Sequence, residues 1–349
     1  MKPKIILLLL LSLPVQAQTH SSAVVLLYHH VDDNTPAITS ISPENFNAHL
    51  KYLSKNDFKV LPLQEIVTSL QSGKVLPEKS IAITFDDAYI NIYTTAYPMM
   101  KKRGFPFTIF VATDLVGTNR HYLSWAQLAE MSDHGTLIAN HTRSHTHLLR
   151  RQPDENHEEW ILRITNEIEG AQTEIENHLG DVPRFFAYPY GEYNRDILAL
   201  VKRLGYIGFG QQSGAIGSES DFLSLPRFPM AGTYTGMAAF KTKVNTVPMP
   251  IRHPDIDPLL AEGVVRPTLE LDFLKGNYRT GELNCYGPGG KLKIEKVDEN
   301  TFNILPIANV PVGRSRYNCT LPSHVGGRFH WFSQPWIRKK DDGSWYPEP

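Results

Sequence analysis

The sequence predicts an α/β domain followed by a smaller β-rich domain. From Val24 to about Gly210, short apolar runs alternate with amphipathic stretches at helical spacing. This alternation is typical of a parallel sheet wrapped by helices, either an α/β barrel or a doubly wound sheet. From about Val247 onward, proline and glycine instead punctuate short alternating runs. That second pattern is typical of a small β-sandwich.

Almost uninterrupted apolar runs predict the buried strands of the first domain. The helices between them carry end signals: Ser42 stands as an N-cap before Pro43, Ser124 caps a later helix, and Gly104 follows a helix end. We expect strands at 23–28, 81–85, 107–111, 137–139, 185–187 and 206–209, and helices from 43 onward and at 63–71, 93–103, 124–132, 155–179 and 194–204.

The composition narrows the class of protein. Of 349 residues, 35 are Lys or Arg and 36 are Asp or Glu, so the formal net charge is −1. This balance argues against nucleic-acid binding through bulk charge. The 2 cysteines are too few for a disulfide scaffold or a cysteine-rich zinc module. The 14 histidines leave metal binding and acid–base catalysis open.

Residues 1–17 have the layout of a secretory signal peptide. Lys2 and Lys4 precede an apolar run from Ile5 to Leu13, and Ala17 offers a small residue at the cleavage point. The alternative is a membrane anchor, but crossing a bilayer takes roughly 20 apolar residues. We therefore expect a periplasmic or secreted mature protein without a membrane-spanning segment.

We expect the first domain to cover residues 18–247 and a proline-rich linker or wrapping segment to follow at 248–267. The β-rich domain would then occupy 268–349 and contain both cysteines, Cys285 and Cys319. An oxidising compartment favours a disulfide between them over two buried free thiols. Strands of this domain are expected at 268–273, 291–297, 301–305, 314–320 and 328–332.

Polar residues with catalytic potential follow three of the predicted strands. Asp86 and Asp87 come directly at the end of strand 81–85. Chemistry in α/β folds collects at the carboxyl ends of strands, and adjacent carboxylates tend to separate in pKa and in role. The alternative interpretation is a simple turn with a helix cap.

Two histidines, His141 and His145, follow strand 137–139 at a spacing that lets both rings reach one ion. The alternative is a solvated histidine-rich loop. After strand 185–187, the run Tyr188-Pro189-Tyr190-Gly191 predicts a shaped loop whose tyrosines offer surfaces to a sugar ring. One acid and two histidines make a three-ligand, open-position site of the zinc type, with the second acid left as a base.

These motifs resemble the polysaccharide deacetylase family, also called carbohydrate esterase family 4. Thr84-Phe85-Asp86-Asp87 matches its first motif, the run from His141 to His145 its second, and Pro189-Tyr190-Gly191 its third. The run Leu27-Tyr28-His29-His30-Val31 further resembles the branch that deacetylates poly-β-1,6-N-acetylglucosamine. The resemblance covers roughly residues 24–228.

The resemblance implies a distorted (β/α) barrel with fewer than eight strands. It also implies a divalent metal bound by Asp87, His141 and His145, most simply zinc, although nickel or cobalt suits the same ligands. By the same resemblance Asp86 would be the general base, and the backbone N–H of Tyr190 would contact the oxyanion. Tyr188, Pro189 and Tyr190 would face the substrate.

Two positions depart from the family pattern. Ala187 stands where the family usually has an arginine that orients the base, and Arg227 stands where it usually has a histidine that serves as the acid. The general acid is therefore unassigned. His29 is a candidate for this role, with a core histidine as the alternative, whereas we interpret His147 as solvated or structural.

The expected function is a metal-dependent deacetylase that removes N-acetyl groups from an N-acetylglucosamine-containing polysaccharide. One alternative is an O-acetyl esterase on a xylan-like polymer, because the same site hydrolyses esters. The other is a non-catalytic carbohydrate-binding protein, which the intact Asp86, Asp87, His141 and His145 disfavour. The partner would be an acetylated polysaccharide and not a nucleic acid.

Overall fold

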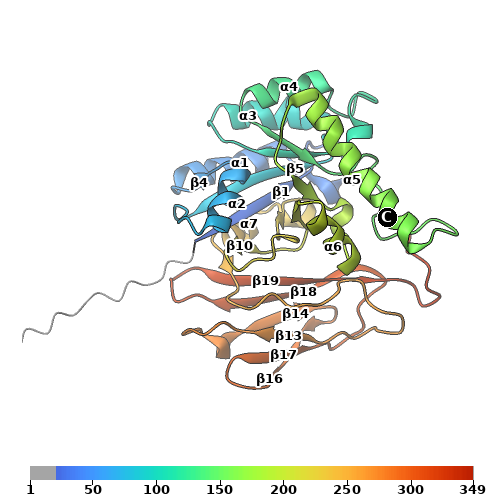
Figure 1. Cartoon of the computed structure of the whole chain (residues 1–349). Coiled ribbons are helices and arrows are strands. Elements are labelled where there is room, and N and C mark those ends of the chain that lie inside the picture. The colour runs from blue at the N-terminus through green and yellow to red at the C-terminus, as the bar shows by residue number, and fades with distance from the viewer. Residues whose placement is uncertain (1–20, 349) are drawn as a thin grey trace, which may run out of the picture.

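The computed structural model describes residues 21–348 of the chain. Buried apolar strands build the central sheet of its first domain. The sheet order is β10-β1-β5-β6-β7-β8-β9, with β4 beside β5 and β11 beside β1. Only β10 runs antiparallel to its neighbour. The sheet curls into an incomplete barrel (Figure 1), which agrees with the predicted distorted barrel. Its strands are β1 Ser22–Tyr28, β4 Lys59–Val60, β5 Ser80–Asp86, β6 Thr108–Val111, β7 Leu137–Asn140, β8 Phe185–Ala187, β9 Ile207–Phe209, β10 Ala215–Gly217 and β11 Phe228–Pro229.

Helices cover the sheet, and the two with predicted serine N-caps, at Ser42 and Ser124, begin as expected. The Asn45 N–H donates to Ser42 Oγ at 3.1 Å, and Ser124 forms a full capping box with Gln127. The helices are α1 Pro43–Lys55, α2 Leu63–Ser72, α3 Tyr97–Lys101, α4 Trp125–Asp133, α5 His157–Leu179, α6 Arg195–Arg203 and α7 Met237–Val244. Short elements are the strands β2 His30–Val31 and β3 Ser40–Ile41, the π-turn η2 Ile92–Ala96, and the 3₁₀ turns η1 Ala37–Thr39, η3 Thr113–Leu115, η4 Pro189–Gly191, η5 Gly232–Tyr234 and η6 Thr280–Glu282.

Two sheets form the C-terminal domain beneath the first one (Figure 1). One contains β12 Val247–Pro248, β19 Phe329–Arg338, β18 Gly313–Pro322, β14 Asn284–Gly287 and β15 Gly290–Lys291, and the other contains β13 Leu269–Asp272, β17 Thr301–Leu305 and β16 Lys293–Lys296. Both sheets contribute to one apolar core, which includes Leu271, Ile304 and Leu321. The disulfide Cys285–Cys319 links paired residues of β14 and β18, as predicted.

The two domains pack closely. β12 pairs with β19, and Trp331 of β19 packs edge-on against Phe228 of the first domain, with 5.3 Å between ring centroids. In the proline-rich segment, Leu259 forms a β-bridge with Ile337, so this segment wraps the domain. The predicted signal peptide lies outside the described residues. Within residues 21–348, none of the helices has both the length and the apolar character needed to span a bilayer.

Candidate active site

The functional side chains gather at the carboxyl ends of parallel strands. Asp86 ends β5 and Asp87 follows it, His141 follows β7, and the loop from Tyr188 begins where β8 ends. Because β5, β6, β7 and β8 are successive neighbours in the sheet, their carboxyl ends meet along one edge. The position agrees with the rule for α/β enzymes.

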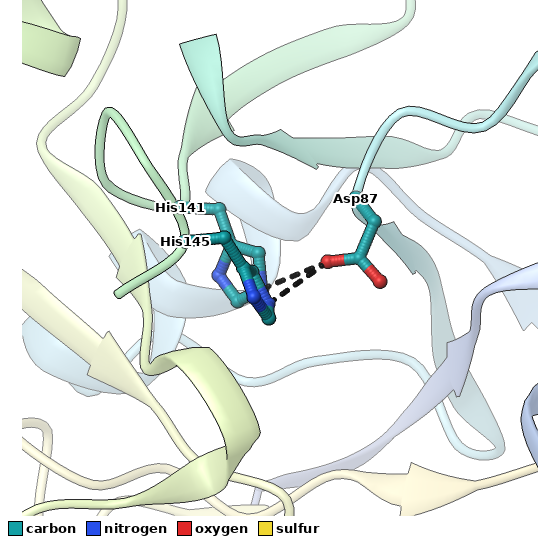
Figure 2. Close-up of side chains that lie close together, drawn as sticks. All are labelled: Asp87, His141 and His145. Carbon is teal, nitrogen blue, oxygen red and sulfur yellow. Dashed lines mark ion pairs between the residues drawn. The ribbon is translucent and has the colours of Figure 1, made fainter. Parts of the chain in front are cut away.

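Asp87, His141 and His145 point toward one another (Figure 2). Asp87 Oδ1 lies 3.3 Å from His141 Nε2 and 3.2 Å from His145 Nε2. Asp87 Oδ1 and His141 Nε2 are both buried, and neither has a satisfying hydrogen-bond partner within residues 21–348. One carboxylate oxygen and two imidazole nitrogens are ligands that suit a divalent ion such as zinc. The three residues therefore fit a metal site.

A hydrogen bond fixes how His141 presents its ring. Its Nδ1–H donates to the carbonyl oxygen of Ala187 at 2.7 Å, so in the neutral ring Nε2 is the unprotonated nitrogen and faces Asp87. Such a partner is usual for a metal-binding histidine. Burial disfavours the charged imidazole, but the carboxylates of Asp86 and Asp87 outweigh it and raise the pKa of His141. The same negative charge would favour a bound cation.

Burial alone would also raise the pKa of Asp87. The adjacent imidazoles of His141 and His145 outweigh burial and hold the pKa of Asp87 well below its usual range. Its carboxylate is thus ionised at neutral pH, as a metal ligand must be.

Left-handed backbone conformations cluster around this site. Asp87, Thr142, His145 and Tyr190 have φ values of 72°, 69°, 57° and 59°, although none is glycine. Each such conformation costs on the order of 1–3 kcal/mol and persists only where the surrounding structure imposes it. Local hydrogen bonds do so here: the Thr142 N–H donates to Asn140 Oδ1 at 2.9 Å, and the His145 N–H donates to Thr142 Oγ1 at 3.0 Å.

Asp86 forms a fully buried, bidentate ion pair with Arg227. Arg227 Nη1 lies 2.7 Å from Oδ1 and Nη2 lies 2.8 Å from Oδ2, while Nε donates to the Gly210 carbonyl at 2.9 Å. Burial raises the pKa of Asp86, but the guanidinium and nearby His141 outweigh it and lower the pKa. The base candidate is therefore held ionised and in one orientation.

The role of Arg227 is not apparent from the sequence. There it stands only as a departure from the family pattern, together with Ala187. In the structure, β11 pairs with β1, and β1 pairs with β5, so residue 227 comes beside Asp86. An arginine from the residue just before β11 thus contacts the base candidate, and the signal available was a charged residue directly before an apolar pair.

His29 directly follows β1 and lies near the same carboxylates. Its Nδ1 is buried, and no other residue that the structure describes forms a hydrogen bond with it. Burial lowers the pKa of His29, although the charges of Asp87 and Asp86 oppose this shift. The next residue differs: His30 Nδ1 contacts Asn91 Nδ2 at 3.0 Å, and its ring stacks on Tyr89. Of the two histidines, His29 has the unsatisfied group beside the candidate site.

The loop after β8 only partly matches its predicted role. Tyr188 is fully buried, and its hydroxyl donates to the Leu223 carbonyl at 2.6 Å. The prediction that Tyr188 faces a sugar is therefore wrong, since its ring belongs to the core. Pro189 is also buried and cannot offer a sugar-binding surface. Tyr190 is partly exposed, and its ring centroid lies 4.6 Å from that of His145.

The geometry agrees with comparisons to known proteins. The polysaccharide deacetylase family model matches residues 73–208. Poly-beta-1,6-N-acetyl-D-glucosamine N-deacetylase of Staphylococcus epidermidis is 29% identical over 230 residues, which are 59% of this chain and 78% of that protein.

Two solved structures share the fold of the first domain. The deacetylase PplD of Streptococcus pyogenes, in complex with acetate, is 26% identical with a TM-score of 0.55, covering 62% of this chain and 95% of that one. IcaB from Ammonifex degensii is 25% identical with a TM-score of 0.56, covering 63% and 96%. The first domain of this chain therefore belongs to the polysaccharide deacetylase family, as its motifs predicted.

Proposed function

We propose that this protein is a metal-dependent N-deacetylase that acts on an N-acetylglucosamine polymer. One observation carries the proposal: a buried carboxylate that Arg227 holds ionised, Asp86, directly precedes the Asp87 of an Asp–His–His cluster. This pairing supplies a base and a metal site in one place. A carbohydrate-binding module would need neither.

Asp87, His141 and His145 would hold the metal, and zinc is the ion we propose from the ligand set. A bound zinc ion would supply an acidified water and polarise the acetamide carbonyl.

The residues of the chain supply the proton transfers. Asp86 takes a proton from the attacking water, and Arg227 keeps its carboxylate ionised and oriented for that step. The Tyr190 N–H donates a hydrogen bond to the carbonyl oxygen as negative charge develops on it. His29, whose Nδ1 is buried beside the site with no hydrogen-bond partner among the described residues, is the group we propose gives a proton to the nitrogen of the leaving amine.

As substrate we propose β-1,6-linked N-acetylglucosamine polymer, outside the cytoplasm. The relative from Staphylococcus epidermidis named for that polymer supports this choice, as does the resemblance of residues 27–31. The Cys285–Cys319 disulfide and the signal-like residues 1–17 support an extracytoplasmic location.

Acetate release from purified protein with added zinc tests the proposal. The substrates are β-1,6-N-acetylglucosamine oligomers, chitin oligomers and acetylated xylan, and Asp86→Asn is measured alongside the wild type. We expect release from the β-1,6 oligomers and a fall of at least about 100-fold in the variant, because the base is lost.

Two results would contradict the proposal. Release from acetylated xylan alone would make the protein an O-acetyl esterase. No release from any substrate, from protein that binds zinc, would favour a carbohydrate-binding protein. Release from chitin alone would keep the chemistry and change the polymer.

A further inference from the structure

Side chains of the C-terminal domain reach the loop that carries Tyr190. Glu192 follows η4 directly and is fully buried. Its Oε1 accepts hydrogen bonds from Arg314 Nη1 at 2.8 Å and from the Tyr346 hydroxyl. Arg314 lies on β18, and Tyr346 lies in the tail after β19. In Figure 1 this tail runs back to the first domain, near α5 and α6. Two segments of the second domain therefore hold one carboxylate of the first.

The same carboxylate holds His147, whose ring covers Tyr190. Glu192 Oε2 accepts a hydrogen bond from His147 Nδ1 at 2.9 Å. The imidazole stacks on the phenol ring of Tyr190, with 3.8 Å between centroids and 6° between planes. Arg314 Cζ also lies over the Tyr190 ring, 5.3 Å from its centroid. Two of the groups that pack on the phenol ring, His147 and Arg314, are thus bonded to Glu192.

Glu348 in the tail completes the ion-pair network. Its carboxylate accepts two hydrogen bonds from Arg314, at 2.8 and 2.7 Å, and one from Arg150 at 3.3 Å. Its Oε1 also lies 3.5 Å from His147 Nε2. His147, Glu192 and Glu348 are close enough to hold an ion. Arg314 and Arg150 together supply positive charge to these two carboxylates, so we assign the cluster as an ion-pair network and not as a second metal site.

The backbone of Tyr190 makes this network functionally relevant. Its φ of 59° is one that the surroundings must impose on a residue other than glycine. We propose that Arg314 is a positioning residue, which holds the Tyr190 N–H in place through Glu192 and His147. The C-terminal domain would then be a working part of the active site and not a separate binding module. The catalytic consequence rests on the proposed function, whereas the positioning of the loop does not.

The buried negative charge of Glu192 explains why the loop that carries Tyr190 would depend on Arg314. Burial alone would raise the pKa of Glu192, but hydrogen bonds from His147, Tyr346 and Arg314 outweigh it and lower the pKa. Without Arg314, a fully buried carboxylate would lose its cation, which is strongly unfavourable. The segment that follows Tyr190 would have to move to bring Glu192 to water.

The test compares Arg314→Met with a matched control, Arg316→Met, in the full chain. Arg316 lies two residues along β18 and also crosses between the domains, but its hydrogen bonds go to the Gln211 carbonyl and Ser213 Oγ, both at 3.3 Å. Hydrogen exchange at Tyr190 and the kcat and KM of acetate release are measured. In Arg314→Met we expect faster exchange and a fall in kcat of about 10- to 100-fold with KM nearly unchanged. Arg314→Lys should recover part of both, and Arg316→Met should show neither.

A second variant, Tyr346→Phe, decides the question if Arg314→Met does not fold. It removes one hydrogen bond to Glu192 without leaving a charge unpaired, and we expect a smaller shift in the same direction. Unchanged exchange at Tyr190 in a folded variant would overturn the positioning role. Faster exchange with an unchanged kcat would overturn the catalytic consequence. If the wild type releases no acetate, the proposed function fails, and the exchange measurement still decides the positioning role.

Discussion

At the scale of single residues, the candidate active site depends on charges that are buried in pairs. Asp86 and Arg227 are both fully buried, and each satisfies the other with two hydrogen bonds. Removing one partner from such a pair costs about 3–5 kcal/mol, because the remaining charge stays buried alone. The pair thus sets both the stability of the site and the ionisation of Asp86, the proposed base.

Arg227→Met should therefore lower activity and change its pH dependence. Without the guanidinium, burial raises the pKa of Asp86, so the base is protonated over a wider pH range. The acid limb of the kcat/KM profile should move to higher pH, and kcat should fall by at least about tenfold. The profile is measured by acetate release between pH 4 and pH 9.

The double variant Asp86→Asn/Arg227→Met provides the control for folding. It leaves neither charge unpaired, so its melting temperature should exceed that of Arg227→Met. Its activity should be as low as that of Asp86→Asn, because it lacks the proposed base. An unshifted acid limb in folded Arg227→Met would contradict the role of Arg227.

The proposed acid role of His29 can be tested by comparing two substrates whose leaving groups differ in their need for a proton. An amine must be protonated as it leaves, whereas 4-nitrophenolate leaves without a proton. We expect His29→Asn to reduce acetate release from N-acetylglucosamine oligomers by about 100-fold and to affect hydrolysis of 4-nitrophenyl acetate much less. His30→Asn is the neighbouring control. Equal losses on both substrates would show that His29 does not act as the acid.

At the scale of elements, the sequence predicted the strands of the first domain because burial on both faces produces unbroken apolar runs. β1 and β5 lie at the expected positions, with every residue of β5 buried. The predicted helix 93–103 differs, since the structure has the π-turn η2 followed by the short α3. Pro98 explains the difference: it lacks an N–H, and its ring crowds the preceding turn of an α-helix.

Several short strands escaped prediction, and β10 and β14 show the reason: their local sequences do not favour extended structure. β10 is only Ala215–Gly217, and β14 is the polar, glycine-ended run Asn284–Gly287. Their strand conformation comes from pairing, β10 with β1 and β14 with β18. Pairing with neighbouring strands therefore stabilises an extended conformation that the local sequence alone does not favour.

At the scale of the whole molecule, the candidate metal ligands were predictable from the sequence. The arginines that contact Asp86 and Glu192 were not. Asp87, His141 and His145 stand in local motifs that mark strand ends. Arg227 contacts Asp86 across 141 residues of sequence, and Arg314 contacts Glu192 across 122. Neither pair carries a local pattern, because only the folded sheet and the docking of the second domain bring the partners together.

The docking of the two domains also makes the disulfide relevant to activity. Cys285 and Cys319 are separated by 34 residues and lie in the core of the C-terminal domain. By chain entropy, closing a loop of this length stabilises the folded state by about 3–4 kcal/mol. Cys285→Ser/Cys319→Ser should lower the melting temperature of this domain, which is measured by calorimetry. Because Arg314 and Tyr346 of the C-terminal domain hold Glu192, activity should also depend on this domain. We expect deacetylase activity to be lost at the temperature where the C-terminal domain melts. A reducing agent should destabilise the wild type and leave the variant unchanged. Activity that persists after the C-terminal domain has melted would show that the first domain works alone.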